Sequence, residues 1–477
     1  MPTHLKKRLI TLHRALLWFA LLGIALFALS GLLHPLMTWT GPRAANFLPP
    51  ATEFNTSDIA AIHAVIKRHS ITSAHQVKLI PSADNQKYVR VSDANNARYF
   101  STTDFSEVPE QDLAQAKWLA SYYSGRPISD IDSIALQKEF TNDYPWVNRL
   151  LPVYRVSFNG DDHLTLYVDT ELNALGSISN QWKSGLQTAF AWIHTWEGFS
   201  GIEPLRLAIM LTLLVPAGLA AVTGIALLFV LARKNIKAVP RRFHRGLGWL
   251  TAIPLLAFIV SGTWHLLHYS SSTQRHSHGR SVSMNLASLQ STESFISQNK
   301  LNQISLVSYK SSLYYRLSIP TPSADASHEH HFNGTPSEAN AVYLPASNTH
   351  ETMTDKTMAL FIAASNREQE GNIVNTTLIT RFGDGYDFRN KRLPVWRVDF
   401  DNNTSSFVDP SAGALIESIE RSDQIEGWSF SNLHKWNFAT QWTGRGLRDA
   451  LMVLTILGIL GVVAFGFSLR KKNQNKN

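Results

Sequence analysis

The sequence predicts an integral membrane protein with four transmembrane α-helices and two duplicated α+β domains outside the membrane. Three observations predict this fold class. The chain of 477 residues contains four long apolar blocks without a single Lys, Arg, Asp or Glu. Lys and Arg gather beside these blocks, and the same short motifs recur in both halves of the chain.

Each apolar block is long enough to cross a membrane. A helix needs about 20 apolar residues to span a hydrocarbon layer about 30 Å thick. A helix buried in a soluble protein seldom runs so far without a charge, so four such blocks indicate a membrane protein. The blocks comprise residues 15–33, 207–231, 246–267 and 450–469.

Basic residues around the blocks predict the orientation. They cluster before the first block, between the second and third, and after the fourth. The positive-inside rule places all three clusters, and both termini, on the cytoplasmic side. The first block is too long for the apolar core of a cleaved signal peptide, and no A-x-A site follows it, so we expect a retained anchor. The expected division is an N-terminus with the first helix (1–37), a first outer domain (38–202), the second helix (203–232), a cytoplasmic loop (233–245), the third helix (246–268), a second outer domain (269–446), the fourth helix (447–469) and a cytoplasmic tail (470–477).

Composition excludes several classes of site. The chain has no cysteine, which removes disulfides, Cys-ligated zinc, iron–sulfur clusters and covalently attached c-type haem. The net charge of +8 resides largely in the clusters that set the orientation. No basic run with interleaved aromatic residues occurs elsewhere, so we expect membrane lipid and no nucleic acid among the partners.

The two halves of the chain repeat the same motifs in the same order. His13-Arg14 and His34 recur as His244-Arg245 and His265, with a spacing of 21 residues in both copies. A Ser-Gly pair precedes the second histidine of each copy. Segments 144–158 and 386–400 share an Asn, a Leu-Pro-Val and an Arg-Val, and residues 193–196 match residues 433–436. These matches predict an internal duplication with pseudo-two-fold symmetry.

The segments outside the membrane show α+β patterns. Residues 153–158 and 164–168 predict a β-hairpin around an Asn-Gly turn, and residues 395–400 and 405–408 predict its copy. Stretches 57–69 and 111–121 are typical of helices. Residues 320–348 are rich in Ser, Ala, Pro and His, which predicts a flexible insertion in the second outer domain.

These strands carry a family resemblance. The pattern V-x-F…L-Y-V-D…G, from Val156 to Gly176, resembles a PepSY domain, and its second copy runs from Val398 to Gly413. Together with the duplicated H-R…S-G…H pattern, the chain resembles the PepSY-associated, iron-regulated transmembrane proteins over nearly its whole length. Some members of that family are similar to ferric-siderophore reductases of the bacterial inner membrane that carry b-type haem. The resemblance implies a multi-pass protein of that membrane, with periplasmic outer domains.

Six duplicated histidines form the candidate cofactor site. At a rise of about 1.5 Å per residue, 21 residues span about 31 Å, so each copy places its two helix histidines at opposite membrane faces. Two histidines are therefore expected at the cytoplasmic face and four at the periplasmic face. The six are His13, His34, His194, His244, His265 and His434.

Two neutral imidazoles suit low-spin haem iron, so six histidines allow up to three haem b groups. The symmetry favours His13 with His244. The other four residues pair either within the repeats, as His34–His194 and His265–His434, or between them; the sequence leaves both open. Arg14 and Arg245 are candidate partners of haem propionates. A weaker metal candidate is the cluster His328, His330 and His331, for which a solvated loop is the favoured interpretation.

The resulting hypothesis is a haem-dependent oxidoreductase that reduces a ferric siderophore in the periplasm during iron uptake. The chain contains no G-x-G-x-x-G segment, so we expect quinol or a separate cytoplasmic reductase to donate electrons. Individual catalytic residues are not assigned. The alternatives are a non-enzymatic, membrane-anchored PepSY protein that binds or regulates a peptidase, or a component of siderophore transport.

Overall fold

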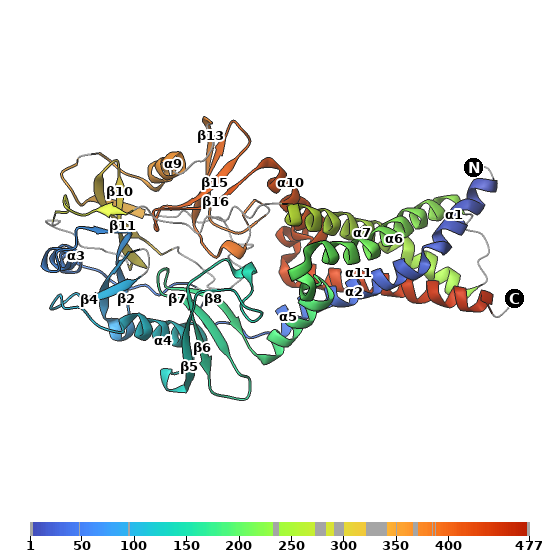
Figure 1. The fold of residues 1–477 in the computed structure, drawn as a ribbon, viewed down its shortest axis with the longest axis horizontal. Coiled ribbons are helices and arrows are strands. Elements are labelled where there is room, and N and C mark those ends of the chain that lie inside the picture. The colour runs from blue at the N-terminus through green and yellow to red at the C-terminus, as the bar shows by residue number, and fades with distance from the viewer. Residues whose placement is uncertain are drawn as a thin grey trace. The chain divides into compact units, whose positions relative to one another are not determined.

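The computed structural model describes residues 3–46, 48–93, 96–231, 238–271, 283–290, 300–320, 341–349, 351–365, 371–383, 385–386 and 388–474. The chain forms two compact units (Figure 1). The helical unit comprises Met1–Gly41, Gln181–Thr273 and Ser422–Asn477, and the outer unit comprises Pro42–Asn180 and Gln274–Arg421.

Within the part of the chain that the structure describes, the helical unit contains four helices that are long and apolar enough to cross a membrane, in agreement with the number expected. Their candidate spans are Leu17–Thr40, Glu197–Val230, Val239–His268 and Trp442–Leu469. The unit is built from α1 (Thr3–Ala15), α2 (Leu17–Thr40), α5 (Gln181–Ile193), η4 (Glu197–Ile202), α6 (Glu203–Val230), α7 (Val239–Ser271), α10 (Arg421–Ser429), η6 (Phe430–His434) and α11 (Asn437–Gln474).

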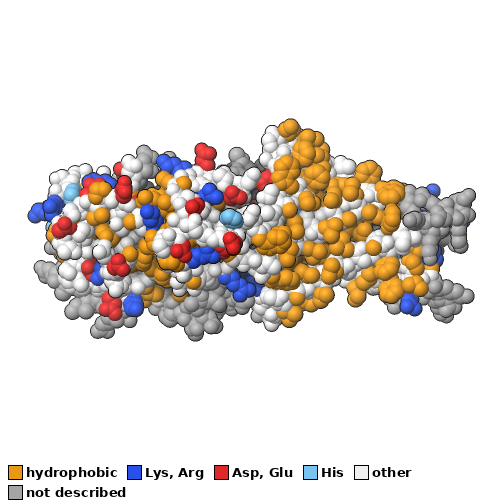
Figure 2. All heavy atoms as spheres, turned by 90° about the horizontal axis from the view of Figure 1, so that it is seen from below, with side chains coloured by type: hydrophobic (Ala, Val, Ile, Leu, Met, Phe, Trp, Pro, Cys, Tyr) orange, Lys and Arg blue, Asp and Glu red, His pale blue; other side chains and the backbone are white. Residues whose placement is uncertain are grey.

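The outward surface of this bundle is apolar. Phe229, Leu250 and Ile253 are each more than 70% exposed (73%, 74% and 73%). Figure 2 shows hydrophobic side chains along the bundle, where charged side chains are scarce. Exposed apolar surface on this scale is costly in water and favourable in a hydrocarbon layer, so it supports the membrane assignment.

Glycines allow the helices to approach closely. A Cβ added at Gly23 of α2 would lie 2.8 Å from the carbonyl oxygen of Leu213 in α6. One added at Gly458 of α11 would lie 2.8 Å from the Thr251 side chain of α7. Small residues at helix crossings are typical of membrane bundles, where close backbone packing replaces the hydrophobic effect as the driving force.

The outer unit is organised around a six-stranded sheet to which both repeats contribute. The strand order is β12-β11-β10-β2-β3-β4, and β2 pairs antiparallel with β10 at Leu79↔Ile304. The strands are β2 (Gln76–Pro81), β3 (Lys87–Ser92), β4 (Ala97–Ser101), β10 (Gln303–Tyr309), β11 (Ser312–Ser318) and β12 (Ala341–Pro345). The two outer segments, expected as separate domains, therefore share one sheet.

Each repeat adds a four-stranded antiparallel sheet of its own. The expected hairpins are present in both, as β6 with β7 and β14 with β15, and a further strand flanks each side. The sheets are β5 (Ile131–Gln137), β6 (Val153–Phe158), β7 (Thr165–Asp169) and β8 (Ala174–Ser179), and β13 (Ile373–Ile379), β14 (Val395–Phe400), β15 (Ser405–Asp409) and β16 (Ala414–Ile419).

Helices cover these sheets through apolar faces. Leu119 and Tyr123 of α4 (Gln111–Ser124) lie in one buried cluster with Val156 and Val168. In the second repeat, α9 (Asp355–Ser365) packs against β14 and β15 in the same way. The helix expected at 57–69 is α3 (Thr56–Arg68), which packs beneath the shared sheet.

Three expected boundaries differ from the structure. Residues 422–446, expected in the second outer domain, belong to the helical unit. Residues 341–345, expected within a flexible insertion, form strand β12, which pairs with β11 from Ala341↔Ser318 to Pro345↔Tyr314. Residues 181–202, expected in the first outer domain, belong to the helical unit, because α5 packs against α2 there.

Candidate functional site

The six duplicated histidines all lie in the helical unit, where four of them form two pairs. His13 and His244 lie with ring centroids 6.4 Å apart, and His194 and His434 lie 6.3 Å apart. Both pairs join one repeat to the other. The pair of His13 and His244 is therefore the one that the symmetry favours. The other pair joins His194 of the first repeat to His434 of the second, so it forms between the repeats rather than within one of them.

Helix ends position the second pair. His194 directly follows α5, and His434 is the last residue of the π-helical turn η6. Two residues after each histidine a tryptophan, Trp196 or Trp436, adopts a left-handed conformation, with φ of 56° and 54°. A non-glycine residue rarely adopts this conformation. The repeated I/L-H-x-W motif thus marks the point where each helix ends and its imidazole enters the bundle.

Hydrogen bonds hold the Nδ1 atom of each paired histidine. His244 Nδ1 lies 2.9 Å from the Val462 carbonyl oxygen, and His434 Nδ1 lies 3.3 Å from that of Phe258. His13 Nδ1 lies 3.0 Å from Thr223 Oγ1, and His194 Nδ1 lies 2.9 Å from Ser30 Oγ.

The partners fix the tautomer of these rings. A carbonyl oxygen only accepts, so Nδ1 of His244 and His434 carries the proton. The Thr223 and Ser30 hydroxyls already donate to backbone carbonyls of their own helices, at 2.8 and 2.7 Å. Their free lone pairs therefore accept from His13 and His194. In all four neutral rings Nε2 is left as a bare lone pair, and the described part of the chain shows no hydrogen bond to it.

Glycines lie beside all four rings. A Cβ added at Gly224 would lie 3.4 Å from Cε1 of His13, and one at Gly466 would lie 3.3 Å from Cε1 of His244. For the second pair the corresponding distances are 4.0 Å at Gly31 and 3.2 Å at Gly262. The Ser-Gly motif indicated Gly31 and Gly262. Gly224 and Gly466 were missed, although they occupy matching places in α6 and α11.

The spacing of both pairs fits two imidazoles on one metal ion. A ring nitrogen lies about 1.1 Å from the ring centroid, and a metal–imidazole bond is about 2.0–2.1 Å, so two rings on opposite sides of a metal have centroids about 6.3 Å apart. Edge-to-face packing of two rings covers the same range. An imidazole whose Nδ1 atom carries the proton has its Nε2 lone pair available to a metal ion. The donor set of neutral imidazoles with anchored Nδ1 atoms fits haem iron.

His34 and His265 do not pair with the other four, because a phenylalanine lies between them. Phe190 stacks on His194 at 4.6 Å and lies 6.3 Å from His34. Phe430 stacks on His434 at 4.8 Å and on His265 at 3.9 Å. Among the described side chains, a phenylalanine ring therefore links the two outer histidines of each repeat. Six rings instead form a ladder in the order His34, Phe190, His194, His434, Phe430 and His265.

The second repeat adds carboxylates beside its outer histidine. His265 Nδ1 lies 2.6 Å from Glu426 Oε1, and His268 Nε2 lies 2.7 Å from Asp423 Oδ1. Both carboxylates belong to α10 and both histidines to α7. His34 has no such bond. The two outer histidines therefore differ chemically although the sequence motif around them is the same.

Arg14 and Arg245, the candidate partners of haem propionates, lie in different environments. Arg245 Nη2 donates to the carbonyl oxygens of Leu228 and Leu231, at 3.1 and 2.6 Å. These carbonyls end α6, so Arg245 caps that helix. Arg14 lies exposed on α1, beside His13.

No larger metal cluster accompanies the pairs. Within the described ranges, no group of three or more His, Asp or Glu side chains is arranged to hold a metal ion. His328, His330 and His331 lie outside the described residues. No protein-family model matches the chain, and no curated protein matches it.

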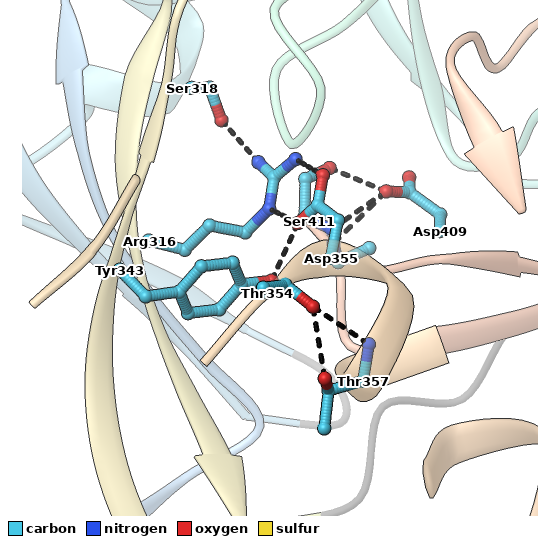
Figure 3. A network of polar contacts seen from close by, with 9 residues as sticks. Arg316, Ser318, Tyr343, Thr354, Asp355, Thr357, Asp409 and Ser411 are labelled. Atoms are coloured by element: carbon cyan, nitrogen blue, oxygen red, sulfur yellow. Dashed lines mark hydrogen bonds and ion pairs between the residues drawn. The ribbon is translucent and has the colours of Figure 1, made fainter. Parts of the chain in front are cut away.

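The outer unit contains buried charges, which form networks among themselves. Arg316 of β11 binds both oxygens of Asp355 at 2.7 Å, and Tyr343 donates to the same carboxylate at 2.6 Å (Figure 3). Near the join between the repeats, Lys78 donates to the Glu171 carbonyl at 2.9 Å. These groups satisfy one another, which indicates a structural role.

Equivalent aspartates of the two repeats differ in this network. Burial and the charge of Glu171 raise the pKa of Asp169 to about 6. Burial would also raise the pKa of Asp409, but Arg392, with the Ser411 hydroxyl and Arg316, outweighs burial and lowers it. Arg392 lies 3.2 Å from Asp409.

These shifts predict opposite effects of two matched substitutions. A group with a raised pKa stabilises the fold at low pH and loses this contribution as pH rises through its folded pKa; a lowered pKa has the reverse effect. In the wild type, ionisation of Asp169 between about pH 4 and 6 destabilises the folded protein. Asp169→Asn removes this ionisation, so the melting temperature at pH 8 is expected to rise. Asp409→Asn is expected to lower it at pH 8. Thermal unfolding of the full chain at pH 4.5, 6 and 8 measures both, and shifts of equal sign at pH 8 would contradict the assignment.

Proposed function

We propose that the protein is a haem b electron carrier of the bacterial inner membrane that reduces a ferric siderophore on the periplasmic side. The observation that supports this most directly is the presence of two cross-repeat histidine pairs, at 6.4 and 6.3 Å, in a bundle of membrane-spanning helices. Ionisable groups among membrane helices are costly and usually functional.

The two pairs lie at different depths. His244 lies near the start of α7, whereas Gly262, next to His434, lies 18 residues further along the same helix. At about 1.5 Å per residue this is about 27 Å, close to the thickness of the hydrocarbon layer. With the orientation expected from Lys and Arg, the first pair lies near the cytoplasmic face and the second near the periplasmic face.

The side chains have defined tasks in this proposal. His13 with His244, and His194 with His434, would each hold one haem iron through Nε2, and bound haem supplies reversible one-electron transfer. Hydrogen bonds at Nδ1 orient the rings and increase their basicity. The apolar helices exclude water, and the close-lying glycines leave space beside each ring.

The overall reaction balances with a quinol donor. One quinol gives two electrons and two protons and becomes a quinone, and two ferric chelates each take one electron and become ferrous chelates. Oxygen ligands bind the doubly charged ion less tightly than the triply charged ion, so reduction favours release of iron.

A spectroscopic experiment tests the function. The full chain, purified in detergent from haem-replete cells, is expected to give a reduced-minus-oxidised spectrum of b-type haem, with two haems per chain by pyridine haemochrome. The reduced protein is expected to reoxidise when a ferric chelate is added in the absence of oxygen. A folded protein without haem, or a reduced protein that no ferric chelate reoxidises, would refute the proposal.

A further inference from the structure

Two histidine–carboxylate pairs lie where α7 meets α10, in the second repeat. His265 Nδ1 lies 2.6 Å from Glu426 Oε1, and His268 Nε2 lies 2.7 Å from Asp423 Oδ1. The two histidines are three residues apart on α7, and the two carboxylates are three residues apart on α10. Residues at this spacing are neighbours on one face of a helix. The two histidine–carboxylate pairs are therefore successive contacts along the same two helices.

The first repeat lacks the carboxylates. When the two I/L-H-x-W motifs are aligned, the residues that match Asp423 and Glu426 are Lys183 and Leu186. The side chains of lysine and leucine contain no hydrogen-bond acceptor. The carboxylates therefore distinguish the second repeat from the first, although the histidine that follows the Ser-Gly motif is common to both.

Aromatic rings connect one of these histidine–carboxylate pairs to the proposed haem site. His265 stacks on Phe430 with ring centroids 3.9 Å apart, and Phe430 stacks on His434 at 4.8 Å. His434 is one of the two rings proposed to hold the second haem iron. A single phenylalanine ring therefore separates this iron ligand from the contact of His265 with Glu426.

A histidine that contacts a carboxylate is suited to donate protons. Imidazole is the side chain that gains and loses a proton near neutral pH. The carboxylate orients the ring and balances its positive charge once the ring is protonated. The side chains of His265, His268 and Asp423 are 30%, 23% and 37% exposed. Each histidine–carboxylate pair can therefore pass a proton from water to a ligand at this end of the bundle.

Reduction of a ferric chelate creates a demand for protons. When iron(III) takes one electron and becomes iron(II), an iron–oxygen bond breaks more readily, and both electrons of the bond stay on the oxygen atom. A hydroxamate or catecholate oxygen is the base of a weak acid and takes up a proton at neutral pH. A carboxylate, with a pKa of about 4, stays ionised. Protonated oxygen does not rebind the iron, so proton donation favours release.

We propose that the two histidine–carboxylate pairs bind the oxygen atoms of a ferric hydroxamate or catecholate and donate protons to them as the iron is reduced. This assignment rests on the proposed function. One electron reaches iron(III), the iron–oxygen bond breaks, and the oxygen takes the proton of a protonated imidazole. The neutral ring then recovers a proton from water. The substrate class is therefore a chelate with weakly acidic oxygen ligands, bound on the side of the second repeat.

Binding of a redox-inert analogue tests the site without electron transfer. Gallium(III) tris(acetohydroxamate) is titrated by calorimetry into the oxidised full chain in phosphatidylcholine nanodiscs. His265→Gln, and Asp423→Asn combined with Glu426→Gln, are expected to weaken binding about five- to tenfold, because hydrogen bonds from charged donors are lost. The control Glu197→Gln changes an exposed acidic residue of η4 in the first repeat. It is expected to leave the affinity within about twofold.

Stopped-flow reoxidation of the reduced protein separates proton donation from electron transfer. Ferric tris(acetohydroxamate) takes up protons as it releases iron, whereas ferric EDTA, a carboxylate chelate, takes an electron alone. The same variants, checked for unchanged haem and helix content, are expected to slow reoxidation by the hydroxamate about ten- to a hundredfold. Reoxidation by ferric EDTA is expected to change by less than about twofold. In the wild type, the solvent deuterium isotope effect is expected to be larger with the hydroxamate.

Other outcomes overturn the proposal in distinct ways. Unchanged gallium affinity and unchanged reoxidation in the variants refute the site and leave the proposed function intact. Equal slowing with both ferric chelates assigns the histidine–carboxylate pairs to electron transfer or to the fold. Slower reduction by quinol, with normal reoxidation, shows that these pairs accept protons from the electron donor instead. If the wild type binds the gallium chelate but no ferric chelate reoxidises it, the proposed function fails and the binding site stands.

Discussion

His13→Ala and His244→Ala are each expected to remove the same one of two haems, and His194→Ala and His434→Ala the other. Each haem needs both rings of its pair, so one substitution should lower the pyridine haemochrome from about two to about one per chain. The double variant His13→Ala with His244→Ala should lose no more than either single one, because members of a pair act as a unit.

His34→Ala and His265→Ala are the matched controls. Both histidines are duplicated and lie at the same end of the bundle, but a phenylalanine separates each from the second pair. We expect their haem content to equal that of wild type. If His34→Ala or His265→Ala loses a full haem while His194→Ala does not, the between-repeat pairing is wrong.

Asp355→Ala is expected to destabilise the outer unit by about 3–5 kcal/mol, because it leaves a buried guanidinium without its carboxylate. Arg316 and Asp355 are 5% and 7% exposed, and Tyr343 also loses its acceptor. Chemical unfolding of the full chain, followed by near-ultraviolet circular dichroism, measures the change. Glu107→Ala is the control, because the Arg98–Glu107 pair is exposed and should contribute less than about 1 kcal/mol. A loss of similar size in both variants would contradict the role of burial.

The sequence predicted the helices of the membrane unit because their signal is local. Charge-free blocks and flanking Lys and Arg suffice to find a span, and a repeated spacing suffices to find His13 with His244. The pairing of the outer histidines depends on how α5 and η6 turn into the bundle. Phe190 and Phe430, which separate the rings, are ordinary apolar residues in the sequence.

The sequence contains no comparable local signal for the six-stranded sheet that the two repeats share. Strand β2 is buried along its whole length and so lacks the alternation typical of a half-exposed strand. It also carries a lysine, Lys78, whose burial depends on Glu171 from a distant turn. Its partner β10 lies more than 200 residues away, and pairing over such a distance depends on tertiary context. Strand β12 was missed because its neighbours in the sequence are polar and rich in Ser and His.

The antiparallel join of β2 with β10 bears on the origin of the chain. Two identical subunits related by a two-fold axis would pair such edge strands in this antiparallel way, each covering the open edge of the other. The histidine pairs, too, each take one ring from either half. A protein of half this length would hold neither the six-stranded sheet nor a complete pair of rings, and two copies together would hold both. Gene fusion of a symmetric homodimer therefore accounts for the architecture. It also allows the surroundings of His34 and His265 to differ, because the two halves of one chain mutate independently of each other.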